Sequence, residues 1–166
     1  MKRGALALSL ALVVVGAVAE PASPARLDEV AKRGAQVMPF DLDKTTHVFS
    51  KTEQGGRQEV VAKDASDAGQ IRLIREHLSA LAQRFALGDF SGPAKIHGEA
   101  MPGLAALQAA RPGQVKYVYE DLPDGGRLDY LADDPALVEA IHRYFDAQLS
   151  DHARHAVPGH PMMHGR

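Results

Sequence analysis

The chain has 166 residues with no cysteine and no tryptophan, and it carries 19 basic against 21 acidic side chains. The absence of cysteine excludes a disulfide-stapled domain, a thiol nucleophile and a lipid-modified cysteine anchor, so a packed core must hold the fold together. The small negative charge and the lack of a basic run argue against nucleic acid and anionic membrane surfaces as partners.

The first 19 residues have the pattern of a secretory signal peptide. Lys2 and Arg3 form a positive start, residues 5–15 are apolar, and Ala17 and Ala19 frame a small-residue cleavage signal. The apolar run is shorter than the roughly 20 residues that cross a bilayer as a helix. We therefore expect cleavage after residue 19, a periplasmic location, and a mature protein with no membrane span and a single domain at residues 20–156.

The chain after the signal peptide begins with an expected helix at residues 24–33. Ser23 can cap this helix, Pro24 suits its first turn, and Gly34 is a natural end.

A hairpin-then-helix pattern follows. Residues 46–52 and 58–63 are predicted strands around a turn at Gly55 and Gly56, and Asp64 or Ser66 is expected to cap a helix that runs to about Leu87. The helix has an apolar stripe that should face a sheet: Ile71, Ile74, Leu78, Leu81 and Phe85.

The same pattern occurs again further along the chain. Strands are predicted at residues 116–121 and 128–132 around Gly125 and Gly126, followed by a helix capped by Asp133 or Asp134. Its expected stripe consists of Val138, Ile141, Phe145, Leu149 and His152.

The two units align at an offset of 70 residues, which places Gly55 over Gly125, Phe49 over Tyr119 and Ile71 over Ile141. A duplication would give an α+β fold, with a four-stranded antiparallel sheet and helices on one face. The alternative is that two common hairpin-helix patterns arose separately.

Two segments lie outside this pattern. Residues 88–114 are rich in Gly and Pro, with a short helix expected around 103–110, and they form the expected functional loop. Residues 157–166 contain His160, His164 and two methionines, and we expect a flexible His/Met tail.

Eight histidines are the unusual feature of the composition. Neutral imidazole binds copper, zinc and nickel, and methionine thioethers favour Cu(I). We expect a Cu or Zn site in which His77, His97 and His152 converge from two helices and the central loop, with His155 and His160 as auxiliary ligands. The alternative for His77 and His152 is ordinary hydrogen bonding at the edge of the core. His47 is interpreted as a packing residue, because it aligns with Tyr117.

Several stretches carry a family resemblance: Arg33-Gly-Ala-Gln-Val-Met-Pro-Phe40, Thr45-Thr-His-Val-Phe49, Val60-Val-Ala-Lys-Asp64, Ile74-Arg-Glu-His-Leu78, Gly88-Asp-Phe90, Ile96-His-Gly98, Met101-Pro-Gly-Leu104 and Phe145-Asp-Ala-Gln-Leu-Ser-Asp-His152. Over nearly all of the mature chain they resemble a family of small exported bacterial proteins whose members are often labelled aspartate carbamoyltransferase. The resemblance implies an export signal, the hairpin-helix order and recurring histidines at 47, 77, 97 and 152.

Transcarbamoylase activity itself is not expected from these residues. Transcarbamoylases resemble one another in having about twice this length, two α/β domains and a Ser-Thr-Arg-Thr loop, and this chain has no such loop. The sequence also has no Gly-x-Ser-x-Gly, His-Glu-x-x-His or Ser-x-x-Lys motif.

Binding rather than catalysis is therefore the expected function, with a metal ion or small molecule as the partner. The alternatives are a small periplasmic enzyme that uses His97 and Glu99 as an acid-base pair, and a structural or partner-binding envelope protein in which the histidines are incidental.

Overall fold

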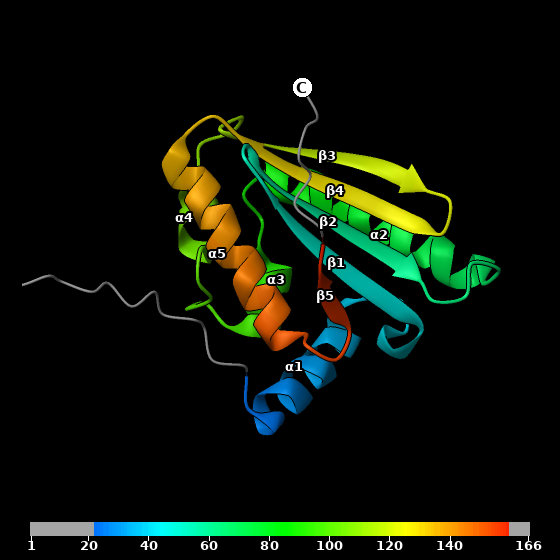
Figure 1. The fold of residues 1–166 in the computed structure, drawn as a ribbon. Helices are drawn as coiled ribbons and strands as arrows, with labels where there is room; N and C mark the ends of the chain where they lie inside the picture. The colour runs from blue at the N-terminus through cyan, green and yellow to red at the C-terminus, as the bar shows by residue number, and fades with distance from the viewer. Residues whose placement is uncertain (1–21, 160–166) are drawn as a thin grey trace, which may run out of the picture.

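The computed structural model describes residues 22–159, and these residues form helices packed on one mixed sheet (Figure 1). The predicted signal peptide and His160 lie outside the described residues. The elements in chain order are α1 Pro24–Val37, the 3-10 turn η1 Leu42–Lys44, β1 Thr45–Thr52, β2 Gly55–Ala62, α2 Ala68–Ala86, α3 Ser91–His97, α4 Leu104–Ala109, β3 Val115–Leu122, β4 Gly125–Ala132, α5 Pro135–Asp151 and β5 Ala156–Pro158. No helix in this part of the chain is long and apolar enough to cross a membrane.

The sheet has five strands in the order β3-β4-β2-β1-β5. The two predicted hairpins supply four antiparallel strands, whereas β5 runs parallel to β1, so the expectation of a purely antiparallel four-stranded sheet was wrong in this detail. Backbone hydrogen bonds to β1 hold β5 in the sheet. The His47 amide donates to the His155 carbonyl at 2.8 Å, and the Phe49 carbonyl accepts from the Gly159 amide at 2.9 Å. The segment expected to begin a flexible tail at 157 is therefore part of the sheet up to Pro158.

The two hairpins have the same register at an offset of 70. Thr45 pairs with Ala62 in the first hairpin, and Val115 pairs with Ala132 in the second. The hairpins meet through β2 and β4, where Gln58 pairs with Leu128. Moving each β2 residue forward by 70 positions and each β4 residue back by 70 turns every β2–β4 pair into another such pair, or into itself. The two hairpins are therefore related by a local two-fold axis, as a duplication predicts.

The two Gly-Gly pairs lie where β2 and β4 meet and not in the hairpin turns, where the sequence predicted them. The turn residues precede each pair, and each pair begins the second strand of its hairpin. A Cβ on Gly55 would lie 2.2 Å from the Tyr130 carbonyl oxygen, and one on Gly125 would lie 2.0 Å from the Val60 carbonyl oxygen. The two hairpins can approach this closely only because both positions lack a side chain.

Helices α2 and α5 cover the same face of the sheet, as expected. A Cβ on Gly126 would meet Leu78 of α2, and a Cβ on Gly56 would meet Phe145 of α5. All five predicted stripe residues of α2 are buried, whereas the buried stripe of α5 is rotated and consists of Leu137, Ala140, Ile141, Tyr144, Phe145 and Gln148.

The helix boundaries correct several expectations. Ser23 caps α1 as predicted, but the helix continues through Gly34 to Val37, and the missing side chain of Gly34 leaves room for that of Met38. Asp67 rather than Asp64 or Ser66 caps α2, while Asp134 caps α5. Residues 88–114 hold two short helices, α3 and α4, of which only α4 was expected.

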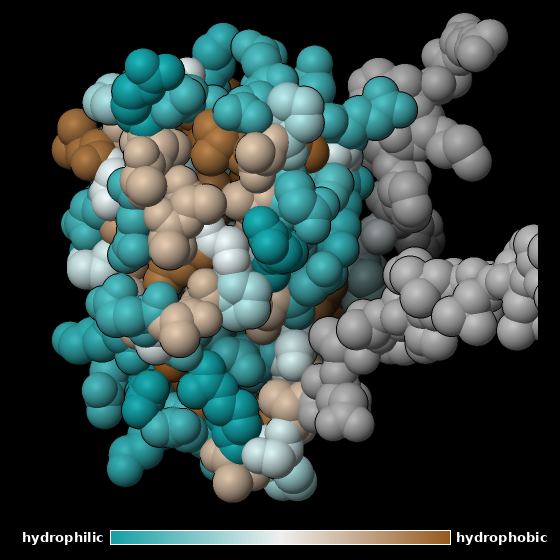
Figure 2. Space-filling view, turned by 90° about the vertical axis from the view of Figure 1, so that its left-hand side faces the viewer, coloured by the Kyte–Doolittle hydropathy of each residue, from teal (hydrophilic) through white to brown (hydrophobic). Residues whose placement is uncertain are grey.

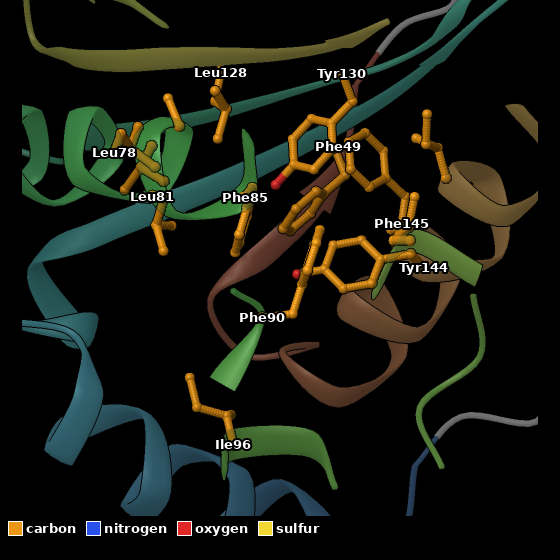
Figure 3. Packing of buried hydrophobic residues seen from close by; sticks show 14 of the residues in the cluster. Phe49, Leu78, Leu81, Phe85, Phe90, Ile96, Leu128, Tyr130, Tyr144 and Phe145 are labelled. Atoms are coloured by element: carbon orange, nitrogen blue, oxygen red, sulfur yellow. The ribbon is translucent and has the colours of Figure 1, made fainter. Parts of the chain in front are cut away.

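Aromatic rings fill the core between the sheet and the helices (Figure 3). Phe85 and Phe90 stack with their centroids 4.3 Å apart, and Tyr117 meets Tyr130 edge-on at 5.3 Å. The buried hydroxyl of Tyr130 donates to Gln58 at 2.8 Å. This group, the aromatic region, comprises Phe85, Phe90, Tyr117, Tyr130 and Tyr144.

Candidate functional site

Four histidines from different elements line one small cavity of about 40 Å³ beside the aromatic region. They are His47 on β1, His77 on α2, His97 at the end of α3 and His152 directly after α5. The volume is sufficient for an ion or a very small number of water molecules. We call these four side chains the imidazole cluster.

His152 lies at the centre of the imidazole cluster. Its ring stacks on His47 with centroids 5.8 Å apart and planes 5° apart, and it meets the ring of His97 edge-on at 4.9 Å. Phe40 contacts both His47, at 5.8 Å, and His77, at 5.5 Å. Three imidazoles are therefore contiguous, and His77 is joined to them through an aromatic ring.

A carboxylate holds His97 in place. Nδ1 of His97 lies 2.8 Å from Oδ2 of Asp151, and the His97 side chain is only 1% exposed. Arg26 of α1 donates to both Asp151 oxygens, at 3.2 and 2.6 Å, and to the His97 carbonyl at 2.8 Å. Burial alone would raise the pKa of Asp151, but the hydrogen bonds from His97 and Arg26 outweigh it and hold that pKa at about 2.

The charged state of Asp151 determines the His97 tautomer. A carboxylate only accepts hydrogen bonds, so Nδ1 of His97 donates to it and Nε2 carries the lone pair in the neutral ring. Metal-binding histidines commonly use such a carboxylate partner, which also fixes the orientation of the ring.

Burial keeps the other imidazoles neutral. It lowers the pKa of His47 to about 4, that of His77 to about 4 and that of His152 to about 2, and neighbouring positive charge contributes to each shift. Nδ1 of His47 is buried without a hydrogen-bond partner in the described part of the chain. Neutral imidazole is the form that binds metals, and a buried nitrogen without a partner costs stability.

The structure places the predicted ligands as follows. His77, His97 and His152, the three expected primary ligands, line the same cavity together with His47, which is interpreted from the sequence as a packing residue. His155, expected as an auxiliary ligand, does not line this cavity; it follows α5, which ends at Asp151, and its Nε2 lies 2.9 Å from Oδ1 of Asp43.

In the structure, the carboxylate partner of His97 is not the expected Glu99. Glu99 is exposed, and the carboxylate at His97 is that of Asp151. Sequence reasoning missed Asp151 and Arg26, which lie 54 and 71 positions from His97 in the chain. The only local signal was the adjacency of Asp151 to His152.

No three His, Cys, Asp or Glu side chains among residues 22–159 are placed so that they could bind one metal ion as they stand. The contacts are pairwise, between His97 and His152 and between His152 and His47. Binding one ion by three of them would require ring rotations within the cavity.

A second hollow lies on the other side of His97. It is an open cleft of about 440 Å³ between α1, α5 and residues 100–102, and Arg26, His97 and Asp151 form part of its wall. His97 lines both the cleft and the cavity of the imidazole cluster. The His97–Asp151–Arg26 contact therefore separates an accessible cleft from a buried cavity.

On the side of the molecule where α4 and α5 lie, hydrophilic side chains interrupt small apolar areas (Figure 2).

Comparisons with known proteins found no matching family model, and no curated protein or solved structure with significant similarity to this chain. The functional argument therefore depends on the site itself.

Proposed function

We propose that the protein is an exported, periplasmic binding protein that holds a transition-metal ion, copper or zinc, in the imidazole cluster. His97 and His152 are the first ligands, His47 the third, and His77 an auxiliary one. The observation that carries this proposal is the Asp151-oriented His97 in edge contact with His152, which stacks on His47 in one small cavity.

The energetic argument concerns the cost of burying imidazoles. His47, His97 and His152 are buried at 3%, 6% and 4% exposure, where apolar rings of similar size would pack without unsatisfied nitrogens. Buried polar groups destabilise a fold unless they find partners. A metal ion would supply the partner that Nδ1 of His47 lacks.

The cavity can accommodate the rearrangement that binding requires. Its volume of about 40 Å³ leaves space beside the rings, and Phe40 contacts both His77 and His47. Rotation of the His47 ring gives up its hydrogen bond with the backbone of His155, whereas His97 stays fixed by Asp151. Asp151 therefore provides one fixed ligand around which the others adjust.

The test is metal titration of the mature chain, purified without an affinity tag, with Cu and Zn. A full-length variant with His160→Gln, His164→Gln, Met162→Leu and Met163→Leu, the tail variant, removes the donors of residues 160–166. Binding of one ion per chain that survives in the tail variant and disappears in His97→Ala/His152→Ala supports the proposal. His142→Ala is the control, because that ring contacts the Thr52 carbonyl outside the cavity. Binding lost with the tail alone, or no binding at all, contradicts it.

A second candidate, a small periplasmic enzyme, is favoured by the position of the His97–Asp151 pair in the wall of the open cleft. A histidine with a fixed carboxylate partner is suited to general acid-base chemistry. In this candidate Asp151 takes the place expected for Glu99. An activity that resists chelators and disappears in Asp151→Asn would favour catalysis over metal binding.

The described surface gives less support to a partner-binding role. The exposed large apolar side chains are Leu87, Val118 and Val157, and the last two lie on the edge strands at opposite sides of the sheet. Arg57 and Asp129 pair across β2 and β4, with nitrogen and oxygen 2.7 Å apart. These described residues do not form a contiguous apolar patch of the kind that marks an interface.

A further inference from the structure

The side chains that line the cavity of the imidazole cluster supply no negative charge. Besides the imidazole cluster, the cavity is lined by the thioether of Met38, by the polar side chains Gln58, Gln148 and Tyr144, and otherwise by apolar groups. No acidic side chain of the described chain lines it. The carboxylate nearest to the cluster, Asp151, is already neutralised by Arg26 at 2.6 Å.

A cavity without negatively charged side chains favours the binding of monovalent over divalent ions. The cost of moving an ion out of water grows with the square of its charge, so a dication pays roughly four times the penalty of a monocation in the same cavity. Zinc sites usually offset this cost with thiolates, carboxylates or a bound hydroxide. Neutral imidazoles and a thioether provide no such compensation, and a cavity of about 40 Å³ has little room for additional water.

The geometry of the rings favours an ion of low coordination number. His152 contacts His97 and His47 in pairs, and no three His, Cys, Asp or Glu side chains of residues 22–159 are placed around one point. Cu(I) is stable with two or three ligands and prefers soft or neutral donors, whereas zinc sites in proteins are almost always four-coordinate.

Met38 adds a soft donor to this set. It is 8% exposed and lies beside the cluster, since a Cβ built on Gly34 would be 2.8 Å from Met38 Cε and 4.0 Å from His152 Cε1. Met38 follows directly after α1, the helix that also supplies Arg26. Thioether sulfur binds Cu(I) and has little affinity for zinc.

We propose that the imidazole cluster with Met38 is selective for a soft monovalent cation, Cu(I), over Zn²⁺ and Cu²⁺. This inference rests on the proposed metal-binding function and specifies its ligand.

The experiment compares Cu(I), Ag(I) and Zn²⁺ on the tail variant of the mature protein, each in competition with a chromophoric chelator, under anaerobic and reducing conditions for Cu(I). Ag(I) serves as a redox-inert monocation with similar ligand preference. We expect one Cu(I) and one Ag(I) per chain, each held at least about 100-fold more tightly than Zn²⁺. Zinc binding that is as tight as Cu(I) binding would overturn the inference and leave the proposed function intact. No binding of any of the three ions would overturn both.

Two substitutions test the physical basis of the selectivity. Met38→Leu keeps the volume and is expected to lower Cu(I) affinity about tenfold with little change for zinc. Gln148→Glu adds a carboxylate to the cavity wall and is expected to narrow the preference for Cu(I) over Zn²⁺ by about tenfold or more. Circular dichroism and thermal unfolding confirm that both variants fold. Equal changes for both metals in both variants would overturn the argument from charge and softness.

Discussion

The aromatic region and the imidazole cluster occupy the same face of one sheet, but they differ in whether their buried polar atoms have hydrogen-bond partners. Tyr117 and His47 occupy equivalent strand positions in the two hairpins, at the offset of 70. In the aromatic region the Tyr130 hydroxyl donates a hydrogen bond to Gln58, whereas Nδ1 of His47 has no hydrogen-bond partner among residues 22–159. The first region is built for packing, and the second retains a cost in stability, which is expected where a protein has a function.

The largest expected difference between the two regions appears on acidification. The pKa values of His47 and His77, about 4, and of His152, about 2, lie below the ordinary value of 6.5, so the unfolded chain binds protons before the folded one does. Stability is therefore fully present above pH 6.5 and declines as the pH falls from 6.5 towards 4, by up to about 1.4 kcal/mol per pH unit for each histidine.

Urea unfolding of the metal-free protein at several pH values between 4 and 7.5 measures this slope. His77→Leu removes one of the three groups and is expected to flatten the slope by about a third. A stability that does not change over this interval would show that the cluster is not kept neutral by burial.

The next largest effect is expected in the aromatic region. Phe90 is 1% exposed, contacts Phe85, Tyr117 and Tyr144, and does not line the cavity of the imidazole cluster, so Phe90→Ala leaves a separate cavity and should cost about 3–5 kcal/mol of unfolding free energy. Metal affinity, measured at a temperature where the variant is folded, is expected to change little. Loss of metal binding in a folded Phe90→Ala protein would mean that metal binding depends on the aromatic region as well.

The sequence predicted the parts of this comparison that depend on local pattern. The strand and stripe periodicities located both hairpins and α2, and the offset of 70 matched the register of one hairpin to that of the other. Asp134 was one of the two caps expected for α5, because a capping signal lies within a few residues of the helix that it starts.

The sequence did not predict the contacts that make the site. Asp151 reaches His97 across 54 positions, and Arg26 reaches Asp151 across 125. The helix α3, which carries His97, has no side-chain cap and contains Gly92 and Pro93, so its local signal is weak. The strand β5 has three residues and forms because β1 offers an open edge. These features depend on the assembled fold rather than on neighbouring residues.

A smaller effect is expected when the carboxylate behind His97 is neutralised. Asp151→Asn keeps the size of the side chain, weakens the ion pair with Arg26 and no longer requires Nδ1 of His97 to donate. We expect metal affinity to fall by about 10–100-fold. Competition titration measures the change, and Asp146→Asn on the same helix is the control, because Asp146 pairs with Lys51 at the surface. Equal losses in the two variants would indicate a general effect of charge rather than orientation of His97.

The smallest effect, and the most direct comparison of the two regions, comes from the equivalent positions 47 and 117. His47→Phe removes the buried nitrogen without a partner while retaining a ring beside Phe49 and His152, so we expect unfolding free energy to rise by about 1 kcal/mol at pH 7.5 while metal affinity falls. Tyr117→Phe is the matched control, and it should leave metal affinity unchanged. Urea unfolding and metal titration of both variants make the measurement. If His47→Phe instead destabilised the metal-free protein, the imidazole would be contributing to the fold by itself, and the stability cost that marks the cluster as functional would not exist at this position.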